Sequence, residues 1–234
     1  ESYLKLMDNK IDLVEKDGKM KIADLKGILY NPPTTSIMDT YYDTSYFLEK
    51  DEKVLILLLD GFGYHQYLYA IENQHAPFLN DVQGVKKATS VYKSVTNAGF
   101  AAMITGKPPF ENGVYSRKQR DLKVPSIFAI AKDLKKSSIL IEGNMKILNT
   151  EIEPVLNIDR NKNGATDDEV FEAALDNLAK DYDLMMVHFH GIDDMGHKYG
   201  DLKEQTMDRI NVIDGYIKEL VEGWKGKVII TADH

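Results

Sequence analysis

The sequence predicts an α/β protein with a mostly parallel central sheet and helices on both faces. Short apolar runs alternate with longer helical patterns from residue 54 onward. The runs are continuously apolar, as expected for strands that are buried on both faces of a sheet. In sheets of this kind, ligands bind at the carboxyl ends of the strands. Candidate functional residues are therefore sought where each apolar run ends.

The alternation defines the expected elements in chain order. The run VLILLL, which begins at Val54, predicts a buried strand, and DGFG after it predicts a turn. Small and apolar residues over 98–106 then predict a helix that closes on Gly106. Further helices are predicted over residues 126–136, 166–182 and 203–224, and further strands over 137–143, 183–189 and 227–231.

The chain is predicted to divide into an N-terminal extension, residues 1–50, and one large domain, residues 51–234. In the extension, the turn residues Asp17-Gly18 lie between short segments of mixed polarity, which predicts a β-hairpin. The prolines of Asn31-Pro32-Pro33 interrupt regular structure after this hairpin. The total of 234 residues is enough for one α/β domain with an ample core.

Composition excludes several classes of protein. Hydrophobic residues make up 43% and charged residues 28%, which is typical of a soluble globular chain. A net charge of −8 disfavours duplex nucleic acid and anionic membranes as partners. The longest apolar run, Val54 to Leu59, is too short to cross a bilayer. The absence of cysteine excludes a thiolate nucleophile and a thiolate metal site.

The first residue is Glu1 rather than Met, which indicates a processed or trimmed chain. Removal of a signal peptide favours a secreted or cell-envelope protein, and a trimmed cytoplasmic protein is the alternative. The sequence does not indicate an oligomeric state.

Three of the apolar runs end in side chains of the types that bind metal ions. Carboxylate oxygens and imidazole nitrogens are the ligands that zinc uses without cysteine, and they also suit manganese. A single Asp after a strand is usually a turn or N-cap residue, but three such strand ends together predict a metal site. Gly196 lies between Asp193 and His197 and would let the backbone bend so that both side chains reach one ion. The residues are Asp60 after the first run, Asp193, Asp194 and His197 after the third, and Asp233 and His234 after the last.

Thr96 is the candidate nucleophile. It directly precedes the small-residue helix, where unpaired backbone N–H groups and the helix dipole favour an anion such as a phosphoryl group. A threonine hydroxyl is a poor nucleophile unless a base or a metal ion removes its proton, so the predicted metal ligands support this role. The alternative is that Thr96 is only an N-cap.

Four motifs, LLLDGFG, SVTNAGFAAMITGKPP, DDMGHKYG and TADH, resemble those of the alkaline phosphatase superfamily in order and spacing. The segment GHKYG resembles the type I phosphodiesterase/nucleotide pyrophosphatase branch, and Thr96-Asn97 resembles phosphonoacetate hydrolase. The resemblance covers residues 54–234 and implies an alkaline phosphatase-like three-layer sandwich. That fold normally continues with closing strands, so we expect the chain to lack its C-terminal closing part.

The resemblance implies two divalent metal ions, zinc or manganese, and a phosphothreonine intermediate on Thr96. It also implies that Asn97 and nearby backbone N–H groups hold the oxyanion. One ion is expected to take Asp60, Thr96, Asp233 and His234, and the other Asp193, His197 and a further histidine beyond residue 234.

Two departures from the family pattern concern the site. The pyrophosphatases carry an asparagine three residues after the nucleophile, where this chain has Gly99, and Asn97 is expected to take over its role. The other departure is that the last histidine of the second metal site is absent from this sequence. His188 and His190 are candidates to replace it, but they lie on one face of a predicted strand, and we interpret them as structural histidines.

The predicted function is a metal-dependent hydrolase of phosphate esters, of the phosphodiesterase/nucleotide pyrophosphatase type, that acts on a small phosphorylated substrate. Two alternatives stay open: a phosphonoacetate-type phosphonate hydrolase and a non-catalytic phosphate-binding homologue. A sulfatase is disfavoured because SVTNAG lacks the cysteine or serine motif that such enzymes mature.

The segment that begins at Asp159 has the Asp, Asn, Asn and Gly spacing that opens a calcium loop. The twelfth position is Val170, which cannot bind calcium. The preferred interpretation is a polar turn followed by a capping box, Thr166 to Glu169, at the start of a helix.

Overall fold

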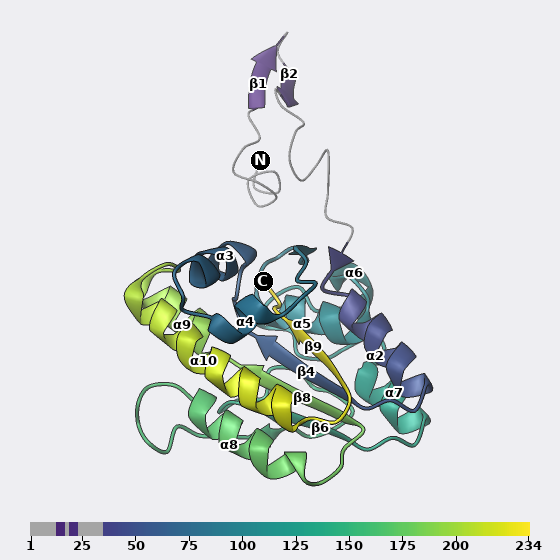
Figure 1. Ribbon diagram of the computed structural model, residues 1–234. Coiled ribbons are helices and arrows are strands. Elements are labelled where there is room, and N and C mark those ends of the chain that lie inside the picture. Colours follow the sequence, from purple (N-terminus) through teal and green to yellow (C-terminus); the bar gives the residue numbers. More distant parts are fainter. Residues whose placement is uncertain (1–12, 17–18, 23–34) are drawn as a thin grey trace.

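The computed structural model describes residues 13–16, 19–22 and 35–234, and its largest sheet has five strands between two layers of helices (Figure 1). The strand order is β7-β6-β8-β4-β9, and every neighbouring pair is parallel. The predicted fold class is therefore confirmed. The strands are β4 Val54–Leu59, β6 Ser138–Glu142, β7 Val155–Leu156, β8 Leu184–Phe189 and β9 Lys227–Thr231.

Strand β4 lies between β8 and β9 and contributes to the cores on both faces of the sheet. All of its residues are buried. Because successive side chains point to opposite faces, the odd-numbered leucines join one hydrophobic core and the even-numbered side chains join the other. The continuous apolar run in the sequence thus reflects burial on both faces.

Helices cover both faces of the sheet (Figure 1). The helices predicted over 126–136, 166–182 and 203–224 are present, each somewhat shorter than predicted. Within the described residues, no helix has the length and apolar character needed to cross a membrane. One layer contains α2 Asp39–Glu49, α5 Thr96–Thr105, α6 Pro109–Asn112 and α7 Ile127–Asp133, and the other contains α3 Tyr64–Glu72, α4 Pro77–Asp81, α8 Asp167–Leu178, α9 Gly191–Tyr199 and α10 Glu204–Gly223.

Helix α5 is the element that carries the candidate nucleophile into the protein interior. Every residue of α5 is buried, and its large side chains, such as Phe100, pack in the core together with Leu48 of α2. The helix begins at Thr96 and ends at Thr105, and the next residue, Gly106, caps it with a φ of 63°, the left-handed conformation that glycine adopts easily. Thr96 is therefore held at the start of a rigid, fully packed helix.

Two pairs of short strands lie outside the five-stranded sheet. β1 Leu13–Lys16 and β2 Lys19–Ile22 pair antiparallel in the segment where a hairpin is predicted, while Asp17-Gly18 and Asn31-Pro32-Pro33 lie outside the described residues. β3 Thr35–Ser36 pairs parallel with β5 Ala88–Thr89. The division of the chain at residue 51 stays a prediction.

Candidate active site

The carboxyl ends of β4 and β9 bring three predicted metal ligands together. Asp60 follows β4, and Asp233 and His234 follow β9. Nε2 of His234 lies 3.3 Å from Oδ1 of Asp60 and 3.7 Å from Oδ2 of Asp233. One ligand atom from each of the three residues lies within 4.8 Å of the others, and both carboxylates are buried. These residues form one cluster at the end of the sheet.

Thr96 faces this cluster from the N-terminus of α5. Its hydroxyl oxygen lies 3.3 Å from Oδ1 and 3.5 Å from Oδ2 of Asp60, so it can donate a hydrogen bond to the carboxylate. Thr96 is the first residue of the helix, the N-cap position belongs to Val95, and no side chain caps this end. The hydroxyl is therefore directed at the acidic cluster rather than used as a helix cap.

Asp193 and His197 lie on a helix, α9, and the predicted glycine-containing turn is wrong. In a helix, side chains four residues apart share one face, and Nε2 of His197 lies 3.3 Å from Oδ2 of Asp193. Oδ1 of Asp193 lies 3.9 Å from Nε2 of His234. The pair thus joins the edge of the cluster, with 65% of the His197 side chain exposed.

A carboxylate that the sequence analysis did not single out fixes the start of α9. Oδ1 of Asp167, on α8, accepts hydrogen bonds from the backbone N–H groups of His190 at 3.0 Å and Gly191 at 3.1 Å. The Asp167 side chain is fully buried, and Nη1 of Arg209 lies 3.5 Å from its other oxygen. Asp167 therefore positions the turn between β8 and α9, and no local sequence signal connects it with that turn.

The loop before α8 differs from the predicted capping box. Helix α8 begins after Thr166 as predicted, but Thr166 makes no side-chain capping hydrogen bond. The carboxylate of Glu169 instead accepts hydrogen bonds from the backbone N–H groups of Arg160 and Asn161. The predicted capping box is wrong, and Glu169 closes the preceding polar loop.

The charges in the cluster are unequally stabilised. Burial opposes the charge of Asp60, but the adjacent imidazoles of His190 and His234 hold the pKa of Asp60 well below its usual range. Burial and the nearby charge of Asp60 raise the pKa of Asp193 and that of Asp233. Burial would lower the pKa of His234, but the surrounding carboxylates raise it to about 9. The raised pKa values of Asp193 and Asp233 reflect repulsion between buried acidic groups, and a cation bound between these groups would relieve it.

Two buried atoms of the cluster fit a metal ion. Among the described residues, Oδ2 of Asp233 and Nε2 of His234 have no hydrogen-bond partner. Buried polar atoms without partners are unusual, and a carboxylate oxygen beside an imidazole nitrogen is a typical pair of divalent-metal ligands. Together with Asp60 and Thr96 they offer oxygen and nitrogen but no sulfur, which suits zinc or manganese.

Asn97 and Gly99 have structural roles in α5. Nδ2 of Asn97 donates hydrogen bonds to the backbone oxygens of Gln119 at 3.2 Å and Ile147 at 3.1 Å, so the oxyanion role of Asn97 stays a prediction. A Cβ atom on Gly99 would lie 2.4 Å from the backbone oxygen of Asp233. The backbone of Asp233 therefore leaves no space for any side chain at position 99.

A three-layer fold with carboxylates, imidazoles and a threonine at the ends of parallel strands defines a metal-binding α/β protein. Residues 118–234, half of the chain, match the sequence model of the Metalloenzyme superfamily, and the chain belongs to this superfamily. Residues 54–157 match the model described as type I phosphodiesterase / nucleotide pyrophosphatase. These matches confirm the family resemblance that the four motifs indicated.

Solved structures show the same fold. Phosphonoacetate hydrolase from Sinorhizobium meliloti, in complex with phosphonoformate, has a TM-score of 0.63 and 17% identity over 96% of this chain and 60% of its own. Murine ectonucleotide pyrophosphatase/phosphodiesterase 5, an inactive variant in complex with AMP, has a TM-score of 0.59 and 20% identity over 78% of this chain and 57% of its own. The human counterpart has 21% identity, the same TM-score and the same coverage.

The chain thus spans 60% or less of the length of these solved structures. No curated protein sequence matches it.

Gly99→Ala is expected to displace Asp233, because the added methyl group would meet backbone atoms that cannot rotate away. A shift of about 1 Å in a ligand can lower activity about 100-fold, so we expect a loss of this order together with weaker metal binding. Metal titration and activity assays check this. Gly215→Ala is the control, since a Cβ there meets nothing within 4 Å and the substitution should only stabilise α10. Unchanged metal affinity in Gly99→Ala would contradict the prediction.

The metal-free protein is expected to lose stability as the pH rises. The pKa of His234 is raised from about 6.5 in the unfolded chain to about 9. The contribution of protonated His234 to folding stability is therefore complete below about pH 6.5 and is lost as the pH rises through about 9. The raised pKa values of Asp193 and Asp233 act in the same direction. Thermal unfolding of chelator-treated protein between these pH values should show a falling Tm, with a smaller fall for His234→Gln. A Tm that is constant or rises over this interval would refute the assignment.

Proposed function

We propose that this chain is the catalytic part of a divalent-metal-dependent hydrolase that cleaves phosphodiester or pyrophosphate bonds in small phosphorylated molecules. The single observation that carries the proposal is the position of the Thr96 hydroxyl, 3.3 Å from Asp60 and at the N-terminus of a buried helix. The candidate nucleophile, a helix start that favours an anion and the candidate metal ligands thus lie close together, which supports the proposal.

Two displacement steps at phosphorus follow from this arrangement. In the first, the Thr96 oxygen forms a bond to phosphorus, the bond to the leaving oxygen breaks, and the leaving group departs with a proton. In the second, water attacks the phosphothreonine, restores the Thr96 hydroxyl and releases a phosphomonoester. Asp60 orients the hydroxyl, and the N–H groups at the start of α5 face the developing negative charge.

Divalent ions complete the chemistry that the side chains cannot supply. Because the pKa of Asp60 is held low, its carboxylate is too weak a base to keep the Thr96 proton. Divalent ions held by these residues would lower the pKa of the hydroxyl and neutralise the nonbridging phosphoryl oxygens. Zinc is the proposed metal and manganese the alternative. One ion is assigned to Asp60, Thr96, Asp233 and His234, and a second to Asp193, His197 and a further ligand.

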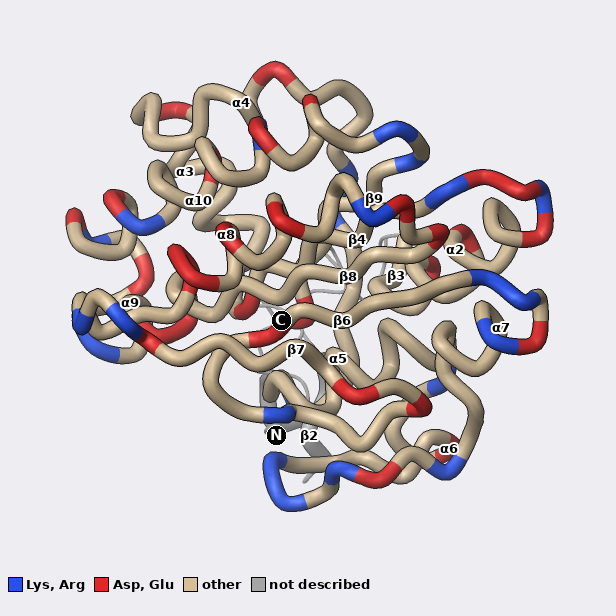
Figure 2. The backbone as a smooth tube through the Cα atoms, turned by 90° about the horizontal axis from the view of Figure 1, so that it is seen from below, with Lys and Arg blue, Asp and Glu red and all other residues tan. Residues whose placement is uncertain are grey.

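A basic loop next to α5 supports an anionic substrate despite the net charge of −8. Lys and Arg positions follow one another along the loop between α6 and α7 (Figure 2). Arg117, Lys118 and Arg120 are exposed, and Gln119 between them accepts a hydrogen bond from Asn97, the neighbour of Thr96. The loop therefore offers positive charge close to the nucleophile, where it attracts phosphorylated molecules.

Phosphonate cleavage is the second candidate. The observation that favours it is the similarity to phosphonoacetate hydrolase, which covers 96% of this chain, against 78% for the ectonucleotide pyrophosphatases. Both reactions use the same kind of metal site, and loops select the substrate.

Thr96→Val tests the proposed nucleophile, because valine keeps the shape of threonine and removes the hydroxyl. We expect turnover of bis(p-nitrophenyl) phosphate to fall roughly 1,000-fold or more while most of the bound zinc remains. Thr96→Ser should keep part of the activity. Assays of p-nitrophenyl phosphate and phosphonoacetate beside the diester identify the preferred bond. A Thr96→Val variant as active as the wild type would exclude the phosphothreonine route, and a metal-loaded wild type inactive on all three substrates would favour the non-catalytic homologue.

A further inference from the structure

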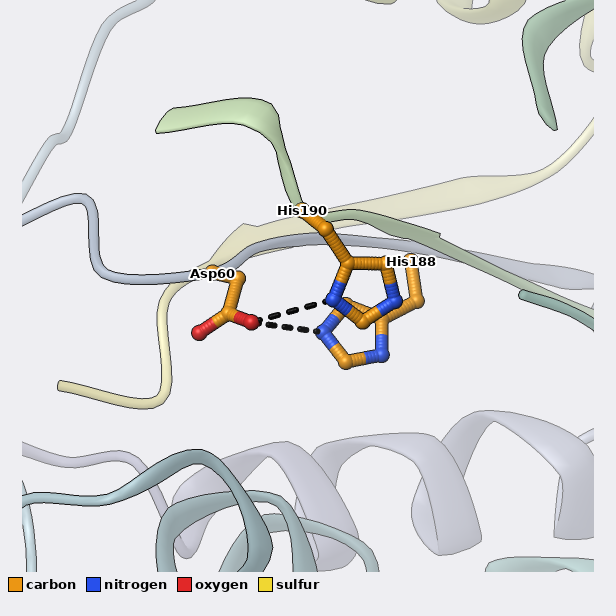
Figure 3. Close-up of side chains that lie close together, drawn as sticks. All are labelled: Asp60, His188 and His190. Carbon is orange, nitrogen blue, oxygen red and sulfur yellow. Dashed lines mark hydrogen bonds and ion pairs between the residues drawn. The ribbon is translucent and has the colours of Figure 1, made fainter. Parts of the chain in front are cut away.

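A second group of ligand-type side chains approaches the other oxygen of Asp60. His188 lies on β8, and His190 follows that strand. Nδ1 of His190 is 3.1 Å and Nε2 of His188 is 3.8 Å from Oδ2 of Asp60 (Figure 3). One ligand atom from each of the three residues lies within 4.8 Å of the others. This group is distinct from His234, which approaches Oδ1 of Asp60.

His188 is enclosed in the core between the sheet and α5. Its side chain is fully buried, and its ring meets the ring of Phe100 edge-on, with the ring centres 5.2 Å apart. Because alternate residues of a strand share a face, His188 points to the same side as Met186, which belongs to the core on the α5 side. A polar atom without a partner is unfavourable in such surroundings.

Glu142 determines which ring nitrogen of His188 carries a proton. Oε1 of Glu142 lies 3.3 Å from Nδ1 of His188, and Oε2 accepts a hydrogen bond from the backbone N–H of Ile147 at 3.1 Å. An ionised carboxylate only accepts hydrogen bonds, so Nδ1 of His188 donates and Nε2 keeps its lone pair. A carboxylate that orients an imidazole in this way is the usual second partner of a metal-binding histidine.

The free nitrogen of His188 faces a carboxylate. Among the described residues, Nε2 of His188 has no hydrogen-bond partner. An imidazole lone pair and a carboxylate oxygen that face each other in the core repel each other unless a cation lies between them. Around a tetrahedral zinc ion with bonds of about 2.1 Å, ligand atoms stand about 3.4 Å apart. The separations of 3.1 Å and 3.8 Å at Asp60 bracket that value.

We propose that Oδ2 of Asp60, Nε2 of His188 and Nδ1 of His190 bind a divalent cation of the zinc type. Two imidazoles and one carboxylate are a sufficient set of protein ligands for such an ion. Asp60 then bridges this ion and the ion held by Asp233 and His234. The additional ion neutralises the buried carboxylate and keeps its Oδ1 directed at Thr96. The histidines are then metal ligands rather than structural residues.

The proposal is tested by counting zinc in the full chain after removal of metal with a chelator and dialysis against Zn²⁺. His188→Asn keeps an amide donor for Glu142 and removes the ligand nitrogen, and His190→Gln removes Nδ1. Each variant is expected to bind one zinc ion fewer per chain than the wild type. Glu142→Gln should weaken the binding of this zinc ion roughly 10- to 100-fold, which is the usual effect of removing a carboxylate that orients a metal-binding histidine. His65→Asn, whose side chain is 60% exposed, is the control and should bind as much zinc as the wild type.

Equal zinc content and affinity in wild type, His188→Asn and His190→Gln would overturn the proposal. His188 would then only be hydrogen-bonded to Glu142, and His190 to Asp60. Circular dichroism verifies that each variant is folded. If His188→Asn does not fold, the decision rests on His190→Gln, whose side chain is already 17% exposed, and on the Co²⁺ absorption spectrum of that variant against the wild type. Zinc counting needs no turnover, so failure of the proposed hydrolysis and failure of this site are distinguished.

Discussion

The site depends on one buried negative charge, the carboxylate of Asp60. Its two oxygens face different partners: Oδ1 lies near Thr96 and His234, and Oδ2 lies near His190. A carboxylate in a protein core is strongly unfavourable unless it is paired, and here imidazoles surround it on both sides. This pairing holds the pKa of Asp60 low, whereas the neighbouring aspartates have raised pKa values. Asp60 is therefore the carboxylate most ready to bind a cation.

The register of the parallel sheet places these partners. In β4, Leu59 lies opposite Phe189 of β8, so Asp60 emerges beside His190. On the other side Leu58 lies opposite Thr231 of β9, so Asp60 also emerges near Asp233 and His234. A slip of β8 by one residue would turn His188 to the opposite face of the sheet. The hydrophobic cores on both faces fix this register, so packing far from the site controls the distances within it.

The sequence predicts the parts of the site that depend on strand ends and fails where distant segments decide the structure. Asp60, Asp233 and Thr96 could be predicted to meet because parallel strands end at one edge and a helix start binds anions. Helix α9 was missed because its glycines and aspartates favour a turn locally, while Asp167, from another helix, supplies the acceptor for its first N–H groups. The Glu142–His188 contact was also missed, because the sequence does not reveal that β6 and β8 are neighbours.

The same arrangement couples metal binding to protons. Before a cation binds, burial and mutual repulsion favour the protonated forms of Asp193 and Asp233, and the surrounding carboxylates favour protonated His234. Each of these groups must lose its proton before it can serve as a ligand, so metal binding releases protons and is weaker at low pH. Asp60 does not share this limit, because its pKa is already low. The first ion is therefore expected to bind at Asp60, and its positive charge lowers the pKa of the neighbouring ligands and completes the site.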